Sequence, residues 1–252
     1  MAKKQREKKQ KGRRNSLLYT IVTCLLIVVS VVGACTVFFR VEFVSVEGNE
    51  RYSEEQVLSV ADVELGANLI LTPGEQIAQR IYKGLSYVNH VDVQKRFPTT
   101  LKLVLTESVP VAVMSSGDGA EWVIDSQGKL LEKVDDTLAL EYIDVEGLTL
   151  ENPQQGQQAQ VPQENGDQLA GLLKLLQAIE SRGIVDKISE IDASSRTEVV
   201  FFYEDRLKVK ILNNADFERK IRILEAIVAT LGANERGTID LKTDTPIASS
   251  DM

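Results

Sequence analysis

Two residue types that serve catalysis and metal binding are scarce in this sequence of 252 residues, which has two cysteines and one histidine. Both cysteines, Cys24 and Cys35, lie within one long apolar run, so the rest of the chain has neither a disulfide framework nor thiolate chemistry. With His90 as the only imidazole, a Ser-His-Asp or Cys-His mechanism has a single candidate base, and a zinc site would need carboxylates as its other ligands.

No motif singles out residues for the two remaining options, Ser-Lys chemistry and hydrolysis by a carboxylate pair. His90 stands beside Asn89 and Asp92 and is predicted to be a surface residue on a strand. We therefore expect no catalytic, cofactor-binding or metal site.

Positive charge is also scarce beyond the apolar run. Residues 40–252 hold 21 of the 29 Lys and Arg but 36 of the 37 Asp and Glu, a formal charge of minus 15. Such a surface repels nucleic-acid phosphates and anionic lipid headgroups. We expect this part of the chain to be soluble, to bind proteins and not to bind nucleic acid.

The apolar run extends from Leu17 to Phe39 and contains neither a charged residue nor a proline over 23 residues. As a helix rising about 1.5 Å per residue it measures about 34 Å, and the hydrocarbon core of a bilayer is about 30 Å thick. Fourteen of its residues are Leu, Ile, Val or Phe, which favour insertion. Residues 17–39 are therefore predicted to form a transmembrane helix.

The residues before this run are basic and are predicted to stay in the cytoplasm, which leaves the C-terminus outside. Residues 1–16 form this tail, which its composition predicts to be disordered. Eight cations stand there against the single acid Glu7: Lys3, Lys4, Arg6, Lys8, Lys9, Lys11, Arg13 and Arg14. A cleaved signal peptide and a lipoprotein box at Val32-Gly33-Ala34-Cys35 are the alternatives, but the run is long for a signal peptide and continues past the cysteine.

The first region after the span is predicted to have the order strand, helix, helix, strand, strand. Residues 41–47 are apolar and β-branched, as in strands. Ser53 begins a capping box, and Thr72 followed by proline begins a second helix. Residues 87–94 and 99–106 alternate apolar and polar side chains. Two helices then cover one face of a small sheet.

Three stretches carry a resemblance to a known family: Val44-Ser45-Val46-Glu47-Gly48-Asn49, then Val91-Asp92-Val93-Gln94-Lys95-Arg96-Phe97-Pro98, then Glu107 with Pro110-Val111-Ala112. With the span and its basic tail, they resemble the FtsQ/DivIB family of bacterial cell-division proteins, whose first exported domain is a POTRA domain. Ser86-Tyr87 and Ser108 depart from the family's pattern. The resemblance implies a POTRA domain over residues 40–110.

The second exported region, residues 111–247, is predicted to be a β-rich domain with two helices, which makes the whole chain α+β. It begins with the alternation and the Gly and Asp turns of a β-meander. Residues 152–167 contain two prolines and many glutamines, and we expect them to be mobile and to carry no fold.

Two amphipathic helices follow in this region. One carries Leu169 to Ile179 and ends near Gly183, and the other is capped by Asn213 or Asn214. Between them a hairpin is predicted whose second arm turns a basic stripe outward, consisting of Arg206, Lys208 and Lys210.

The last predicted strand covers residues 238–242 and resembles the family's closing strand, with Lys242 in place of Arg. Residues 248–252 are predicted to be a short tail. We expect this strand at a sheet edge, where exposed amides and carbonyls accept a strand from a partner, although Pro246 removes one donor. By the resemblance, the partner-binding residues are Thr238, Ile239, Asp240, Leu241, Lys242 and Ile247.

The resemblance implies a non-enzymatic scaffold of the divisome in the cell membrane at the division septum. Such a protein crosses the bilayer once, joins small bitopic proteins of the FtsB/DivIC and FtsL kinds, and helps regulate septal peptidoglycan synthesis. A membrane-anchored cell-wall hydrolase or protease is the alternative, and it requires a converging set of catalytic side chains. Transport or outer-membrane assembly is a third class, which would require repeated POTRA modules or a C-terminal barrel.

Overall fold

The computed structural model describes residues 2–232, 234–243 and 247–250, and it describes side chains outside residues 2–18, 136 and 248–250. The chain forms two compact units. Unit 1 comprises Met1–Ile81 with His90–Leu105, and unit 2 comprises Tyr82–Asn89 with Thr106–Met252. Of the predicted terminal tails, residue 1 and residues 251–252 lie outside the described part, as do residues 244–246, which include Pro246.

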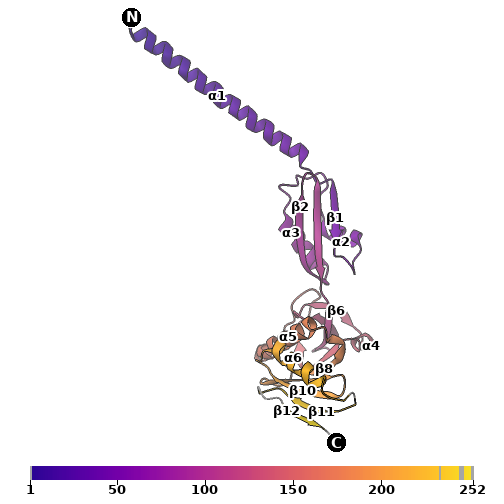
Figure 1. The fold of residues 1–252 in the computed structure, drawn as a ribbon. Coiled ribbons are helices and arrows are strands. Elements are labelled where there is room, and N and C mark those ends of the chain that lie inside the picture. The colour runs from indigo at the N-terminus through magenta and orange to yellow at the C-terminus, as the bar shows by residue number, and fades with distance from the viewer. Residues whose placement is uncertain (1, 233, 244–246, 251–252) are drawn as a thin grey trace. The chain divides into compact units, whose positions relative to one another are not determined.

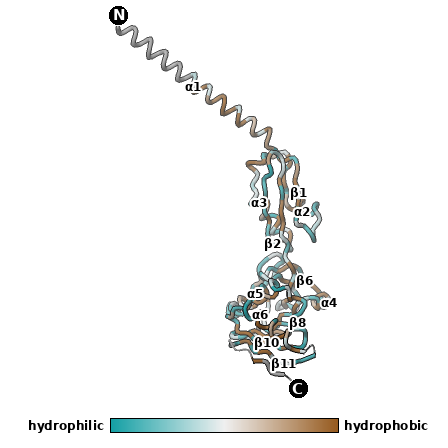
Figure 2. The backbone as a smooth tube through the Cα atoms, viewed as in Figure 1, coloured by the Kyte–Doolittle hydropathy of each residue, from teal (hydrophilic) through white to brown (hydrophobic). Residues whose placement is uncertain are grey.

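Helix α1 extends over Ala2–Phe38 (Figure 1). Its part Tyr19–Phe38 is long and apolar enough to cross a membrane, and Figure 2 shows the hydrophobic colour along it. The prediction of a disordered basic tail is wrong, because the helix begins at Ala2. Lys, Arg, Gln and Glu are good helix formers, and the apolar helix that follows supplies the nucleus on which they extend.

Unit 1 contains a three-stranded sheet and two helices, in the predicted order. The elements are β1 (Phe43–Glu47), α2 (Glu54–Ala61), α3 (Gly74–Gly84), β2 (Val88–Arg96) and β3 (Thr100–Glu107). The strand order is β1-β3-β2, with β1 parallel to β3. Ser53 caps α2 through the predicted capping box with Gln56. Buried side chains come from both helices and from β3: Val57, Ala61, Ile77, Ile81, Leu101, Leu103 and Leu105.

Unit 2 contains one nine-stranded sheet with the order β12-β11-β10-β9-β8-β7-β4-β5-β6. Its strands are β4 (Pro110–Ser116), β5 (Glu121–Asp125), β6 (Leu130–Val134), β7 (Ile143–Leu150), β8 (Ile188–Asp192), β9 (Glu198–Tyr203), β10 (Leu207–Leu212), β11 (Gly237–Asp240) and β12 (Ile247–Ser250). Its helices are α4 (Asp136–Ala139), α5 (Gly166–Ser181) and α6 (Phe217–Val228), with short 3-10 turns at Gln163–Asn165 and Val185–Lys187.

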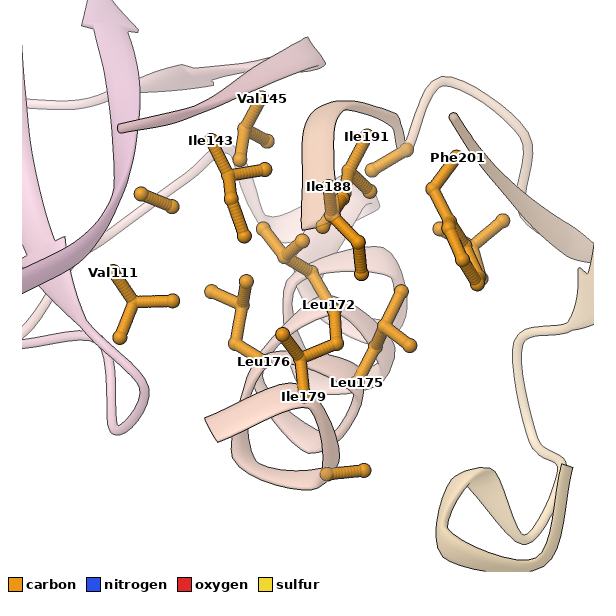
Figure 3. Packing of buried hydrophobic residues seen from close by; sticks show 14 of the residues in the cluster. Val111, Ile143, Val145, Leu172, Leu175, Leu176, Ile179, Ile188, Ile191 and Phe201 are labelled. Atoms are coloured by element: carbon orange, nitrogen blue, oxygen red, sulfur yellow. The ribbon is translucent and has the colours of Figure 1, made fainter. Parts of the chain in front are cut away.

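The core of unit 2 lies between the sheet and the helices α5 and α6. Figure 3 shows one side of α5 turned toward the strands, with leucines at helical spacing facing isoleucines of β7 and β8. The side chains in this contact are Leu172, Leu175, Leu176, Ile179, Ile143, Val145, Ile188, Ile191 and Phe201. The amphipathic pattern read from the sequence therefore identified the buried face of α5.

Two strands of this sheet were not predicted. β7 lies in the middle, parallel to both β4 and β8. Its apolar alternation breaks at Gly147, which has φ of +83° and approaches Ser194 so closely that a Cβ there would lie 2.4 Å from the Ser194 backbone nitrogen. The second is β12, formed by four residues of which the last three were assigned to a tail.

Two further expectations are corrected. The N-cap of α6 is Asp216, whose Oδ1 accepts from the Arg219 amide at 3.1 Å, and not Asn213 or Asn214. Residues 152–167 are not without fold, because their backbone binds the β5–β6 hairpin. The Leu130 amide donates to the Gln157 carbonyl at 2.8 Å, and the Gly156 amide donates to the Leu130 carbonyl at 2.7 Å.

Candidate partner-binding edge

The nine-stranded sheet has two edges, which differ in whether another segment of the chain hydrogen bonds to them. At the β6 edge, the segment around Gly156 and Gln157 hydrogen bonds to Leu130, and Lys129 forms an isolated bridge with Gln158. At the other edge, β12 pairs with β11, and no described strand lies on its outer side. The outer side of β12 is therefore the open edge of this sheet.

The strand β11 is positioned by the helix that precedes it. β10 leads into α6, and the chain then returns to place β11 parallel to β10, with Val209 opposite Ile239. The α6 stripe of Phe217, Ile221 and Leu224 is buried in the core of the unit. The ladder continues one residue past β11, because the Leu241 amide donates to the Lys210 carbonyl at 2.9 Å.

Two of the predicted partner-binding residues face the core. Ile239 and Leu241 are each 1% exposed and belong to the buried cluster beneath the helices. Successive strand residues point to opposite faces, so a strand with these two side chains inward turns its polar residues outward. Ile239 and Leu241 thus hold β11 in place, and their side chains are covered.

Thr238, Asp240 and Lys242 are half-buried and lie on the opposite face. The Lys242 Nζ lies 3.0 Å from Glu198 Oε2 and 3.4 Å from Asp240 Oδ2, and its amide donates to Asp240 Oδ1. The hydrogen bond to Glu198 and the charge of Asp240 raise the pKa of Lys242 above its usual value. These contacts join the end of β11 to β9, two strands away.

The expectation that residues 238–242 form the edge strand is wrong, because β12 covers them. β12 runs antiparallel to β11, with Asp240 opposite Ile247 and Ile239 opposite Ala248. Ile247 is 63% exposed. β12 has only four residues and follows Pro246 directly, so no alternation of apolar residues distinguished it from a tail.

The predicted basic stripe consists of Arg206, directly before β10, and of Lys208 and Lys210 on the strand. The Arg206 guanidinium donates to Glu204 Oε2 and to the carbonyls of Gly232 and Glu235, so it fixes the hairpin turn to the loop before β11. Lys208 is exposed, and its Nζ lies 5.7 Å from the ring of Phe202.

An acidic region lies on two central strands of the same sheet. Asp144 stands opposite Glu190, and Glu146 opposite Asp192, in the parallel pairing of β7 and β8. Burial and the charges of Glu146 and Asp144 raise the pKa of Glu190. The charge of this sheet thus changes from acidic at β7 and β8 to basic at Lys208 of β10.

The remaining candidate residues do not form a cluster. His90 is exposed on β2, as predicted. Among the residues that the structure describes, no three His, Cys, Asp or Glu side chains are grouped to hold a metal ion. Trp122 is half-buried on β5, within the core side of unit 2.

Comparison with known protein families assigns the two regions that follow α1 separately. Residues 39–108 match the family described as POTRA domain, FtsQ-type, and residues 112–242 match the one described as cell division protein FtsQ/DivIB, C-terminal. The chain belongs to the FtsQ/DivIB family. The predicted family and the α+β fold with a POTRA domain are thus confirmed.

Curated relatives agree with this assignment at low identity. The chain is 23% identical over 196 residues to the cell division protein FtsQ of Syntrophotalea carbinolica, covering 77% of this chain and 67% of the relative. It is 21% identical over 207 residues to DivIB of Clostridium acetobutylicum, covering 81% and 80%, and 27% identical over 199 residues to FtsQ of Geobacter sp. strain M21, covering 78% and 69%. With its N-terminal apolar helix, this FtsQ/DivIB protein is a membrane-anchored cell-division protein.

Proposed function

We propose that this FtsQ/DivIB protein is a non-enzymatic, bitopic scaffold of the divisome. Its N-terminus lies in the cytoplasm, residues 40–252 lie outside, and the protein links FtsB/DivIC-like and FtsL-like partners and helps regulate septal peptidoglycan synthesis at the septum. The family supports a divisome role. The observation that carries the partner-binding part is the open outer side of β12.

The orientation rests on the charge distribution around α1. Lys and Arg residues beside a membrane span stay on the cytoplasmic side and so set its orientation. Eight Lys and Arg precede Leu17, which orients the N-terminus toward the cytoplasm. The acidic remainder of the chain then lies outside, where it meets protein partners instead of nucleic acid.

Strand addition is the proposed mode of binding. A partner strand beside β12 exchanges backbone hydrogen bonds with it, and the outward side chain of Ile247 provides an apolar contact. Thr238 and Asp240 on β11 pair with β12 beside this contact, and Lys242 follows two residues after β11.

Backbone pairing alone is weak, which constrains the mode of assembly. A four-residue strand forms a few hydrogen bonds, each contributing about 0.5–1.5 kcal/mol, whereas a micromolar complex requires about 8 kcal/mol. Apolar burial at Ile247 and confinement of all partners to one membrane supply the difference, because tethering raises the effective concentration.

Depletion and complementation in the source bacterium test this proposal. Depletion is expected to block septation, and the unaltered gene is expected to restore it. Because the protein is proposed to make and break no bond, His90→Ala is also expected to restore septation fully. Ile247→Asp, which places a charge on the open edge, is expected to restore it poorly although the protein accumulates normally.

Normal septa after depletion would refute the divisome role. Turnover of peptidoglycan or of a peptide by the purified chain, lost on substitution of a Ser, Glu or His, would instead support the anchored hydrolase or protease.

A further inference from the structure

Unit 1 carries a group of exposed apolar side chains that its fold does not require on the surface. Leu65 is 65% exposed, Ile70 44%, Leu71 78% and Phe97 59%. Exposing a large apolar side chain to water costs about 1.5–3 kcal/mol relative to burying it. We name these four residues, from the loop before α3 and the β2–β3 turn, the apolar rim.

The loop and the turn that carry the apolar rim contact the end of helix α1. The ring of Phe97 packs edge-on against the ring of Phe39, with centroids 5.5 Å apart. The Leu69 amide donates to the Phe39 carbonyl at 2.8 Å, and Asn68 Nδ2 donates to the Cys35 carbonyl at 3.4 Å. The bond from Leu69 gives a partner to a carbonyl just past the helix end, and the bond from Asn68 adds a second donor to the Cys35 carbonyl, which already accepts from the Phe39 amide. The rim therefore lies at the level of the last helical turn.

The loop is held in shape by polar bonds. Asn68 Oδ1 accepts from the amides of Ile70 and Leu71 at 2.9 and 3.3 Å, and Lys95 Nζ donates to the Ile70 carbonyl at 2.7 Å. Leu69 points inward and is fully buried. The outward direction of Ile70 and Leu71 is therefore built into the loop.

We propose that the apolar rim lies in the outer interface of the lipid bilayer, beside the point where α1 leaves the membrane. The rim is continuous with the apolar surface of the last turn of α1, where Val37 and Phe38 are 62% and 72% exposed. This inference rests on the proposed membrane span of α1, and it adds a second point of contact between protein and lipid.

Local charge agrees with a lipid occupant although the exported chain is acidic as a whole. Arg40 Nε donates to the Thr36 carbonyl at 3.2 Å and Lys95 Nζ donates to the Ile70 carbonyl, so both cations lie beside the rim, where they would meet headgroup phosphates under this proposal. Interfacial amphipathic helices bury their apolar face about 5–10 Å into the boundary between headgroups and acyl chains, and we propose that the apolar rim enters the same layer. The contact would restrict the rotation of the POTRA domain about α1.

Fluorescent labels on the full chain in lipid nanodiscs test the inference. In a Cys24→Ser, Cys35→Ser background, single cysteines replace Leu71 or Phe97 and carry an environment-sensitive dye, and nanodiscs contain lipids brominated along the acyl chain. The matched control is Leu140→Cys in unit 2, since Leu140 is 86% exposed and apolar like Leu71. Val29→Cys, within the span, reports whether α1 itself lies in lipid.

We expect dyes at positions 71 and 97 to emit at shorter wavelength and to be quenched about twofold or more compared with the dye at position 140. Leu71→Asp is expected to reduce the quenching of a dye at position 97, because it places a charge in the interface. If position 29 is quenched while positions 71 and 97 behave like position 140, the rim does not contact lipid. If position 29 is not quenched, the membrane span on which the inference rests is refuted instead.

Discussion

The two edges of the nine-stranded sheet in unit 2 differ in how the chain covers them. At β6 the chain supplies its own cover: residues around Gly156 and Gln157 bond to Leu130, and Gln155 Nε2 donates to the Leu131 carbonyl at 2.9 Å. At β12 four residues end the sheet, and Ile247 is exposed there. Because an uncovered edge strand is a hazard for a soluble protein, one that is kept open is a candidate for partner binding.

A buried lysine marks the covered edge. Lys129 is 1% exposed, its Nζ donates to the Val88 carbonyl at 2.6 Å, and the same atom lies 3.8 Å from the centroid of the Tyr82 ring. Nearby, the Tyr87 hydroxyl donates to Glu132. The covered edge is therefore fixed by side chains as well as backbone, and we expect it to contribute to stability, whereas the open edge contributes to binding.

The largest effect is expected from Lys129→Ala at the covered edge. The change removes a packed stem and leaves the Val88 carbonyl and Asp125 without their cation, which costs about 3 kcal/mol in the free energy of unfolding. Trp122 is the only tryptophan of the chain and lies in unit 2, so its fluorescence during urea unfolding reports this unit alone. Lys133→Ala, at an exposed position on β6, the strand that follows Lys129, is the control, and we expect it to change stability by less than about 0.5 kcal/mol.

A smaller loss is expected from Gln155→Ala. Its amide also donates to Ser86 Oγ at 3.1 Å, so the substitution removes two hydrogen bonds from the cover of β6. We expect a loss of about 1 kcal/mol in the same urea measurement. An unchanged midpoint would mean that the segment covers β6 without stabilising it.

The pH dependence of unfolding tests the environment of Lys129. Burial lowers the pKa of Lys129 from 10.5 to about 8, partly opposed by the charge of Asp125. Since the folded pKa is the lower one, the unfolded chain binds more protons between about pH 8 and 10.5, and this residue makes unit 2 more stable as pH rises through that window. Lys129→Met should remove this rise. We expect the unfolding free energy of the unaltered chain minus that of the variant to be larger at pH 10 than at pH 7.5, which are roughly the ends of that window.

The smallest effect is expected at Lys242, two residues after β11, the strand next to the open edge. Lys242→Met removes the contacts to Glu198 and Asp240, but these groups remain in contact with solvent, where ion pairs contribute little. We expect no measurable shift in the urea midpoint of Trp122 fluorescence. A loss comparable with that of Lys129→Ala would contradict the division between a structural and a binding edge.

Regular patterns and family motifs made much of the fold predictable. The spacing of Leu172, Leu176 and Ile179 identified the buried face of α5, and the Ser53 capping box located the start of α2. Both signals depend on residues within a few positions of each other. Elements whose start or buried face is encoded by residues a few positions apart could therefore be predicted.

Features that depend on distant contacts could not be predicted in this way. Lys129 can be buried because its ammonium group donates to the Val88 carbonyl and lies over the ring of Tyr82, both more than 40 residues earlier. Gly147 interrupts the alternation of β7 because the backbone of Ser194 passes beside it. β12 has no apolar periodicity, so the prediction placed the sheet edge one strand too early, at residues 238–242.

Photocrosslinking in native membranes tests the central claim most directly. A photoreactive residue replaces Ile247 on the open edge or, in the matched control, Lys133 on the covered edge. We expect Ile247 to capture small single-span division proteins and Lys133 to capture none. Equal capture from both positions, or none from Ile247 in dividing cells, would contradict the claim that the outer side of β12 is where this protein joins its partners.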